Sequence, residues 1–531
     1  MPRATPTSDE AAPADGPAAE IPSTPHRPTA RALARLWTAV ALAGCLLYGL
    51  TAQHGVSWQD SGLFQWRILT GDYVGNLGLA LAHPLYIGMG RLAAYLPLGD
   101  FAWRINVLSG LGMALALANL AGLVTWLTRR PMAGLLAAGL LAVCHTVWWL
   151  ATIAEAYTWV VAGLTAELWL LAALLKRPRW PLLAALALVS GLGWTLHNFA
   201  LLPLPVYLAV AVVLVVRRRL PAWSLAAAAG GYLLGAAPYL VLIAGEAGES
   251  GLAPAIASAL FGKYRGAVMN VSNPGRLFKA NAALASMNFA GLLVPLAVVG
   301  WVKMRRWAGG ATAAALGAIG LIELLFVVRY PVPDQFTFLL PTLTMLALGA
   351  GVGIAHLCSL SRRWRIGAVT ACLISIAAQP AIYAAAPALA RASGVGISRR
   401  RKLPFRDELR YWLVPWKHNE HSAERFARAA LAEAQAAPDT LAGVIFASST
   451  SAHPLRLTRE LGDSSSGVVV QTDTGPLPPY GTSPGAFRLA AGDRPLFIVA
   501  PVAGYAPDRL LEDANFHRPE GHVLYRVQWA D

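Results

Sequence analysis

Residues 105–130 read INVLSGLGMALALANLAGLVTWLTRR, an apolar run without a charged residue that ends on two arginines. A helix needs about 20 such residues to cross the hydrocarbon core of a bilayer, so this run is long enough to span a membrane. Lys and Arg accumulate in cytoplasmic connections, so Arg129 and Arg130 assign the end of this span to the cytoplasmic side. The stretch therefore predicts a transmembrane helix with a defined direction.

The composition of the whole chain agrees with this pattern. The chain has 531 residues, of which 56% are hydrophobic and 13% are charged, whereas about a quarter of the residues in a soluble domain are charged. Because the shortage coincides with long apolar runs, we predict a polytopic α-helical membrane protein. Further runs bring the total to about eleven transmembrane helices, at residues 36–52, 131–150, 154–175, 180–197, 199–216, 221–243, 289–302, 310–328, 335–357 and 366–388.

The net charge of +15 gathers in short clusters that occupy every second connection. The connections between them carry no Lys or Arg near 150–154 and 197–199, and only Arg329 near 329–334. This alternation assigns the N-terminus to the cytoplasm and places loop 53–104, loop 244–288 and everything after residue 390 outside. The charge is then a topology signal, and no nucleic-acid partner is expected. The clusters are Arg129-Arg130, Lys176-Arg177-Pro178-Arg179, Arg217-Arg218-Arg219, Lys303 with Arg305-Arg306, and Arg362-Arg363 with Arg365.

Three parts are predicted along the chain. Residues 1–30 are rich in Pro, Ala, Ser and Thr and form a disordered cytoplasmic tail. Residues 31–390 form the membrane domain; its first run is short enough for a cleaved signal peptide, and we favour a retained helix. Residues 391–531 form a small extracytoplasmic α/β domain with a helix at 419–437. Its strands are expected at 441–448, 467–471, 495–500 and 522–529.

The first outer loop begins with Ser57-Trp58-Gln59-Asp60-Ser61-Gly62. Asp60 lies a few residues beyond the first span, where the headgroup of a lipid-linked substrate would sit. Transfer of a sugar from a polyprenyl phosphate to a hydroxyl needs a base for the hydroxyl proton and cations for the departing phosphate. One base opposite the leaving group gives inversion. Asp60 is the predicted base; the alternative is an Asp60 or Ser61 that only caps a helix over residues 63–69.

Further polar residues fall at the outer ends of the spans. Glu155 is a second candidate catalytic acid, because a carboxylate beside membrane-buried helices is costly unless it has a function; the alternative is a solvated loop residue. His83 and His197 are candidates for donor or phosphate binding, or ordinary boundary residues. The topology signal does not explain Arg329, so a phosphate contact is expected there, with a surface pair to Asp334 as the alternative. Arg67 and Arg104 are also candidates for phosphate binding.

No metal-ligand spacing is present in the sequence. The four cysteines, Cys45, Cys144, Cys358 and Cys372, all fall inside apolar spans and are expected to be buried thiols without a disulfide framework. One or two outer carboxylates would coordinate a divalent metal weakly, so that question stays open and no cofactor is assigned.

Several motifs in order resemble the bacterial branch of the protein O-mannosyltransferase-like membrane family, a GT-C glycosyltransferase family. They are Asp60-Ser61-Gly62, His83-Pro84-Leu85-Tyr86, Arg104-Ile105-Asn106-Val107-Leu108-Ser109, Glu155-Ala156-Tyr157, Leu196-His197-Asn198, Tyr330-Pro331-Val332-Pro333-Asp334-Gln335-Phe336-Thr337-Phe338, Leu403-Pro404-Phe405-Arg406-Asp407 and Val414-Pro415-Trp416-Lys417. The resemblance implies a GT-C-like fold, a polyprenyl-phosphate sugar donor and an acid of the first outer loop as base, a position that Asp60 occupies. Glu155 is similar to the acid of the second outer loop in that superfamily.

The chain departs from the family pattern at two places in the first outer loop. His83-Pro84 runs directly into Leu85-Tyr86, where the family often has Pro-Gly-Tyr-Pro, and Leu63 stands where the family often has an acid. Both positions belong to the loop that should hold donor and acceptor, so the resemblance leaves the sugar undefined.

We therefore predict an inverting glycosyltransferase of a bacterial cytoplasmic membrane, with a polyprenyl-phosphate-linked sugar as donor. The acceptor would be a protein, lipid or glycan hydroxyl on the extracytoplasmic face, and membrane lipids surround the spans. Two alternatives stay open. One is a transporter or lipid flippase, and the other is an inactive relative that keeps the fold as an assembly module.

Overall fold

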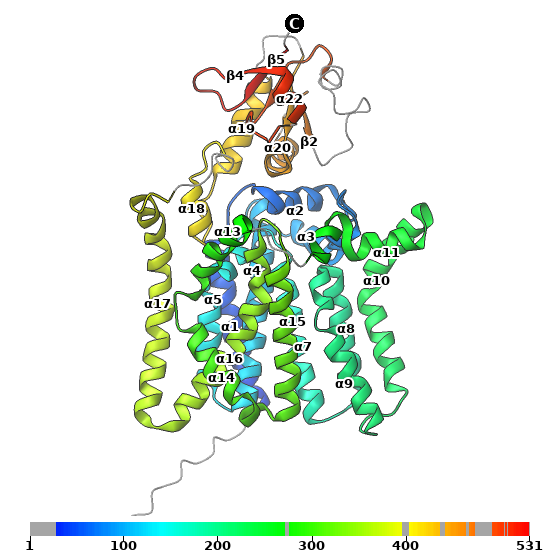
Figure 1. Ribbon diagram of the computed structural model, residues 1–531, viewed down its shortest axis with the longest axis vertical. Helices are drawn as coiled ribbons and strands as arrows, with labels where there is room; N and C mark the ends of the chain where they lie inside the picture. The colour runs from blue at the N-terminus through cyan, green and yellow to red at the C-terminus, as the bar shows by residue number, and fades with distance from the viewer. Residues whose placement is uncertain are drawn as a thin grey trace, which may run out of the picture.

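The computed structural model describes residues 28–270, 275–395, 403–435, 441–462, 467–472, 491–503, 505–506 and 508–529. The predicted tail at 1–30 therefore lies almost wholly outside the described residues. The described chain forms a bundle of long helices with a small sheet domain at one end, and several short helices lie between the two (Figure 1). We call this end of the bundle the domain face.

Eight helical segments of the described chain are long and apolar enough to cross a membrane. They are α1 (Ala30–Thr51), α4 (Phe101–Thr128), α7 (Tyr157–Lys176), Asn198–Val216, which contains η2 (Asn198–Leu201) and α9 (Leu204–Val216), α10 (Ser224–Ser250), α15 (Gly310–Arg329), Gln335–Leu360, which contains η5 (Gln335–Leu339) and α16 (Leu340–Leu360), and α17 (Arg362–Ala392). Two bent pairs raise the number to ten, and α8 (Trp180–Leu196) is a shorter apolar helix. Each of the predicted spans thus coincides with a helix, although by length and apolarity the structure supports eight to ten.

The two bent pairs correct the expectation of straight spans at these places. α5 (Pro131–Ala142) and α6 (His145–Ala151) meet at 75°, and Phe278–Phe289 meets α14 (Leu293–Ala308) at 79°. Asn288 lies at the break before α14, and its side chain bonds Thr146 at the break between α5 and α6. Its Oδ1 accepts from the Thr146 N–H and its Nδ2 donates to the Thr146 hydroxyl, each at 2.8 Å. Because these contacts satisfy backbone and side-chain groups freed by the bends, each break stabilises the other.

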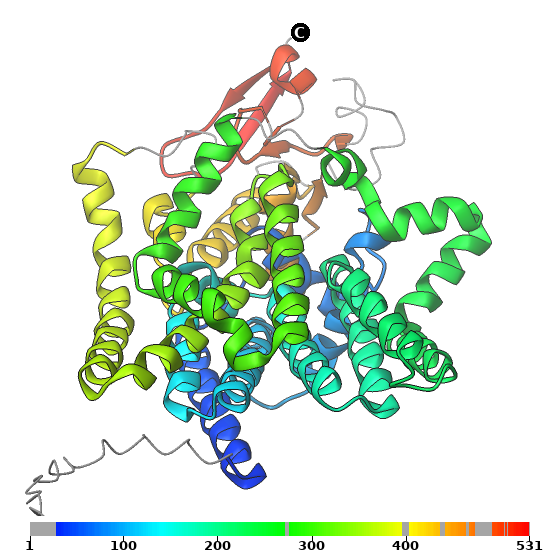
Figure 2. The same ribbon diagram turned by 60° about the horizontal axis from the view of Figure 1, so that its bottom comes forward.

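Small residues allow the helices of the bundle to approach closely. A Cβ added at Gly300 of α14 would lie 1.7 Å from the Gly349 carbonyl of α16, and one added at Gly235 of α10 would lie 2.3 Å from the Leu188 carbonyl of α8. Close backbone approach at glycine is typical of helix packing in membranes, where dispersion replaces the hydrophobic effect. α17 and α10 flank the bundle on opposite sides in both views (Figures 1 and 2).

Short helices cover the domain face. They are α2 (Gln59–Thr70), η1 (Leu79–Leu81), α3 (Pro84–Ala94), α11 (Leu252–Phe261), η3 (Gly262–Tyr264), α12 (Arg265–Met269) and α13 (Gly275–Ser286). α2 and α3 come from the first predicted outer loop, and α11 to α13 from the second. The Lys263 N–H donates to the Leu77 carbonyl at 3.1 Å, so the two loops contact each other.

The C-terminal domain has a five-stranded sheet in the order β2-β1-β3-β5-β4 among the described residues. β1 pairs in parallel with β2 and β3, whereas β5 pairs antiparallel with β3 and β4. Four strands fall at the predicted positions, but β4 and α20 were not predicted. The elements are α18 (Glu408–Leu413), α19 (Ser422–Gln435), β1 (Val444–Ala447), α20 (Ser449–Leu461), β2 (Val469–Thr472), β3 (Leu496–Ile498), α22 (Asp508–Asp513), β4 (Ala514–His517) and β5 (Tyr525–Trp529).

Candidate functional site

Three acidic side chains from distant segments lie within electrostatic reach of one another at the domain face. Asp60 lies in the first turn of α2, Glu155 lies in the connection between α6 and α7, and Asp334 lies just before η5. Burial raises the pKa of Glu155 well above its usual value, and the charges of Asp60 and Asp334 raise it further. Burial, with a further contribution from Asp60, raises the pKa of Asp334 to about 7. We call these three residues the carboxylate site.

Asp60 is the most exposed member of the carboxylate site, whereas Asp334 is partly buried and Glu155 is buried. The Asp60 side chain is exposed, yet the protein around it raises its pKa through loss of hydration. The N-cap of α2 is Trp58, which makes no side-chain capping bond, so the alternative in which Asp60 caps this helix is wrong. Gln59, directly before Asp60, has a φ of 57°, a left-handed conformation that is strained for a residue with a side chain. Such strain often accompanies functional sites.

Glu155 is only 7% exposed, which argues against a solvated loop residue. The Ser61 hydroxyl of α2 donates to its carboxylate at 3.2 Å. Its backbone is clamped by Ser109 of α4, whose hydroxyl accepts from the Glu155 N–H at 2.8 Å and donates to the Glu155 carbonyl at 3.0 Å. Tyr86 of α3 contacts the same hydroxyl at 2.9 Å. Glu155 thus ties α2, α3 and α4 together beneath Asp60.

His83 and His197 stack on each other, with ring centroids 5.3 Å apart and an interplanar angle of 18°. His83 Nδ1 donates to the Leu196 carbonyl at 2.5 Å, and His197 Nδ1 accepts from the Phe199 N–H at 3.1 Å. Burial lowers the pKa of His83 to about 4 and the pKa of His197 well below its usual value. Both imidazoles are therefore neutral near pH 7 and can act on a ligand only as hydrogen-bonding or stacking groups.

An aromatic cavity of about 210 Å³ opens beside this histidine pair. Two tyrosines of the cavity lie near the carboxylate site. The pKa of Tyr264 is raised first by burial and then by the charges of Asp60 and Asp334, and the pKa of Tyr330 is raised first by burial and then by the charge of Asp334. The cavity is lined by Ala80, Leu81, His197, Asn198, Phe199, Leu201, Leu202, Leu260, Phe261, Tyr264, Val268, Phe326 and Tyr330.

Arg329 contacts Phe326, a residue of the cavity lining, and does not form a surface pair. Its guanidinium sits 5.2 Å from the ring centre of Phe326 and donates to the Asn270 carbonyl at 3.1 Å. No ion pair joins Arg329 to Asp334, both of which belong to the described chain, so that alternative is wrong. A half-buried guanidinium beside an aromatic cavity suits an anionic headgroup.

The contacts of Arg67 favour a structural role over the predicted phosphate contact. Arg67 is 2% exposed and donates to the carbonyls of Asp72, Leu81 and Ala82 at 3.1, 2.9 and 2.8 Å, so it holds its own outer loop in shape. Arg104 donates through Nη1 to the Leu96 carbonyl at 2.7 Å, but its buried Nε has no hydrogen-bond partner among the described residues. A phosphate contact by Arg104 therefore stays a prediction.

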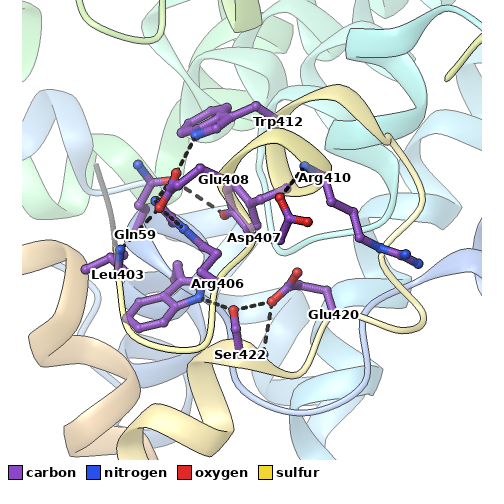
Figure 3. A network of polar contacts seen from close by, with 11 residues as sticks. Gln59, Leu403, Arg406, Asp407, Glu408, Arg410, Trp412, Glu420 and Ser422 are labelled. Atoms are coloured by element: carbon purple, nitrogen blue, oxygen red, sulfur yellow. Dashed lines mark hydrogen bonds and ion pairs between the residues drawn. The ribbon is translucent and has the colours of Figure 1, made fainter. Parts of the chain in front are cut away.

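Residues 403–422, called here the covering segment, contact Trp58 and Gln59 at the N-terminus of α2 (Figure 3). Arg406 forms a two-bonded pair with Glu408, through Nε to Oε1 at 2.8 Å and Nη2 to Oε2 at 2.9 Å, and both residues are buried. The Arg406 guanidinium also lies 4.3 Å from the ring centre of Tyr411. The Tyr411 hydroxyl reaches the Gln59 side chain at 3.5 Å. This network reaches the side chain of Gln59, the residue that immediately precedes Asp60.

Asp334 and Tyr264 were not predicted as site residues. Asp334 was named only as a possible partner of Arg329 and as part of the family motif at residues 330–338, and its place in an outer connection beside two prolines was the signal that could have found it. The covering segment contributed two family motifs, at residues 403–407 and 414–417, but no site residue was assigned to it. Among the described residues no group of three or more His, Cys, Asp or Glu side chains is arranged to hold a metal ion.

Three comparisons place this geometry among known proteins. Residues 78–220 match the family model of the protein O-mannosyl-transferase TMEM260 N-terminal domain. The search of curated proteins finds no match. The crystal structure of ArnT from Cupriavidus metallidurans bound to undecaprenyl phosphate has 15% identity and a TM-score of 0.53, over 94% of this chain and 98% of that chain. The apo structure of the same ArnT has 16% identity and a TM-score of 0.54, over 93% and 97%.

Both comparisons agree with the resemblance read from the sequence motifs. The structural likeness extends over nearly the full length of both chains, so it includes the bundle, the domain face and the C-terminal domain. The family match covers the segment from η1 to the end of α9, which carries Glu155 and both histidines of the stacked pair. The chain thus has the fold of a GT-C membrane glycosyltransferase, and its residues 78–220 match the protein O-mannosyl-transferase TMEM260 N-terminal domain family.

Proposed function

We propose that this protein is an inverting glycosyltransferase that moves a sugar from a polyprenyl phosphate to an acceptor hydroxyl, with Asp60 as the general base. The observation that carries the proposal is the carboxylate site, in which the exposed Asp60 lies near an aromatic cavity and Arg329. The GT-C fold and the match to an O-mannosyl-transferase family support a glycosyltransferase.

In the proposed reaction, one group accepts the proton and another leaves with the electron pair. The acceptor oxygen attacks the anomeric carbon while its proton passes to the Asp60 carboxylate. The bond from that carbon to the phosphate oxygen breaks, and the electron pair leaves with the polyprenyl phosphate. Arg329 is the cation expected to stabilise the departing phosphate, and Lys263 and Arg265 flank Tyr264 on the adjoining loop.

Asp60 is preferred to Glu155 as the base for an electrostatic reason. Both have raised pKa values, but Glu155 is buried and lies beside two other acids, so it holds a proton more tightly. A protonated Glu155 accepts from Ser61 and can itself donate a hydrogen bond, which suits positioning of α2 or of the acceptor. Asp60 is exposed, so its carboxylate is the one that an entering hydroxyl can meet.

The aromatic cavity is the proposed place for the first isoprenoid units of the donor lipid. Its lining is apolar except for the stacked histidine, an asparagine and two tyrosines, and Arg329 lies at its Phe326 wall. Cavities of this kind orient a lipid whose charged headgroup meets a few polar groups. One of the similar solved structures, that of ArnT, holds undecaprenyl phosphate, which is a lipid of this class.

The distribution of basic residues supports an extracytoplasmic site in a bacterial cytoplasmic membrane. Basic clusters follow α4, α7, α9 and α14 at the end of the bundle away from the domain face. By the positive-inside rule that end is cytoplasmic, so the carboxylate site faces outside. The O-mannosyl-transferase match favours a protein hydroxyl as acceptor.

The test uses the full-length protein in lipid vesicles with a radiolabelled undecaprenyl-phosphate sugar and hydroxyl-bearing peptides. Transfer is expected with the parent protein and with Glu249→Gln, which neutralises an exposed acid at the end of α10. Asp60→Asn should lower transfer at least about 10²-fold, because loss of a general base has an effect of that size. Undiminished transfer by Asp60→Asn would remove Asp60 from the mechanism, and uptake of the lipid without transfer would favour the flippase alternative.

A further inference from the structure

The largest cavity described here lies at the end of the bundle opposite the carboxylate site. It has a volume of about 670 Å³ and is formed where α4, α7 and α14 end and where α1 and α8 begin. The residues that line it are Pro28, Ala30, Leu33, Trp126, Leu127, Thr128, Arg129, Ala173, Lys176, Arg177, Arg179, Leu182, Arg306 and Trp307. The helix α4 runs between this cavity and the end of the bundle that carries Asp60, and its 28 residues are about 42 Å long.

The charge of this cavity is entirely positive among its described lining residues. Five cations come from three separate connections, namely Arg129, then Lys176, Arg177 and Arg179, then Arg306, and no Asp or Glu accompanies them. The C-terminal ends of α4, α7 and α14 each carry partial negative charge. This charge stabilises the nearby cations but offsets only a part of their repulsion. The five cations therefore give the cavity a positive electrostatic potential, which the concave surface focuses.

The topology signal alone does not account for this convergence. Arg217, Arg218 and Arg219 satisfy the same positive-inside rule in the next basic connection, but none of them lines the cavity. Arg129 reaches the cavity from a left-handed backbone conformation, with a φ of 59°, in which a non-glycine residue is strained. Arg129 is the C-cap of α4, so this conformation turns the chain at the end of the helix and leaves Arg129 in the cavity lining.

The apolar part of the lining selects the class of ligand. Trp126 and Trp307 stand beside Leu33, Leu127 and Leu182, and Lys176 lies 4.0 Å above the Trp126 ring. The Trp307 indole Nε1 is buried and has no hydrogen-bond partner among the described residues, so it presents a spare donor. Cations and an N–H donor suit a phosphate, and the leucines suit the glycerol and first acyl carbons of a lipid.

We propose that this cavity binds the phosphate headgroup of an anionic phospholipid from the leaflet opposite the carboxylate site. The lipid holds together the ends of α4, α7 and α14, which would otherwise repel one another through their basic side chains. This binding site is separate from the proposed donor site and does not depend on the glycosyltransferase proposal.

Native mass spectrometry of the delipidated full-length protein tests the proposal. We expect phosphatidylglycerol to bind as a retained adduct. Phosphatidylcholine should bind at least about tenfold more weakly, because the five basic side chains repel its choline cation. Inorganic phosphate should also bind at least about tenfold more weakly, because it lacks the glycerol and acyl carbons that would contact the leucines. The double variant Arg129→Gln with Arg306→Gln should lose about tenfold or more of the phosphatidylglycerol affinity. The matched control is Arg218→Gln with Arg219→Gln, because Arg218 has a similar left-handed conformation with a φ of 51°.

Each outcome decides the proposal. Equal phosphatidylglycerol binding by the two double variants, with thermal unfolding of both unchanged, would overturn it. Phosphatidylcholine bound as tightly as phosphatidylglycerol would show that the cavity does not select a headgroup of net negative charge, and would overturn the proposal. Inorganic phosphate bound as tightly as the lipid would replace the lipid with a soluble phosphate. Transfer activity in the vesicle assay is a separate readout, so failure of the catalytic proposal leaves this one intact.

Discussion

The Trp58 indole donates a hydrogen bond of 2.8 Å to the hydroxyl of Ser422, which lies 364 positions later in the chain. Trp58 is the N-cap of α2 and is 1% exposed, and its ring packs 5.2 Å from that of Phe426. Asp60 follows two residues later. The C-terminal domain therefore fixes the start of the helix that carries the proposed base, and disturbance of the domain should reach the site.

Ser422→Ala tests this connection. Removal of the acceptor leaves a buried indole N–H without its partner, so the free energy of unfolding should fall by about 1–3 kcal/mol, and transfer should fall with it. Chemical or thermal unfolding together with the transfer assay would measure both effects. Ser250→Ala on α10 is the control, because its hydroxyl is exposed and bonds only within its own helix. Equal stability of the two variants would contradict the expectation.

Arg406→Gln should destabilise the covering segment strongly. Glu408 would remain buried without its charge partner, and breakage of a buried ion pair costs about 3–5 kcal/mol. We expect faster proteolysis of residues 403–422 and a lower melting temperature. Arg410→Gln is the matched control because Arg410 is exposed. A protease-resistance profile that does not change in Arg406→Gln would show that the ion pair does not hold this segment.

Gly62→Ala should reduce transfer without preventing membrane insertion. A Cβ at this position would lie 2.3 Å from the Ser57 carbonyl, so the first turn of α2 must shift and Asp60 with it. A displacement of about 1 Å costs on the order of 10²-fold in rate. Gly88→Ala on the neighbouring helix α3 is the control, since its Cβ would meet nothing closer than 3.9 Å. Equal transfer rates in both variants would argue against a fixed position for Asp60.

Asp334→Asn should change the pH dependence of transfer and of stability. Transfer needs a deprotonated base, and the negative charges of the carboxylate site raise one another's pKa values, so loss of one charge should move the acid limb to lower pH. The pKa of Asp334 is raised from 3.8 to about 7, so its contribution to stability is fully present below pH 4 and is lost as pH rises through 7. The melting temperature of the variant relative to that of the parent should therefore rise between pH 4 and pH 8. Parallel curves for parent and variant would oppose this assignment.

Arg329→Gln and Arg67→Gln should separate donor binding from structure. Arg329→Gln is expected to raise the KM for the polyprenyl-phosphate donor about tenfold, because one charge-assisted hydrogen bond to phosphate is lost. Arg67→Gln should instead lower the melting temperature, because the carbonyls of Leu81 and Ala82 lose their donor in a buried place. Steady-state kinetics and melting curves on the same preparations would compare them, and the opposite pattern would reverse the two roles.

The sequence by itself determined the approximate limits of the apolar helices and the placement of the polar residues at their ends. It predicted about eleven spans, whereas eight to ten of the described segments are long and apolar enough to cross a membrane. The limits and the placement are local properties, since a run of about 20 apolar residues and a basic cluster act on the bilayer directly. The ordered motifs around Asp60, Glu155 and His197 also indicated the superfamily, and the fold comparison agrees.

Only the tertiary structure decided which of these residues act together. Ser61 meets Glu155 across 94 positions, and Trp58 meets Ser422 across 364, through the packing angles of whole helices. The same packing added Asp334 to the carboxylate site and placed Arg67 inside its own loop, where carbonyls occupy it. Hydropathy and charge are fixed residue by residue, but the distance between two side chains depends on every contact that orients the helices between them.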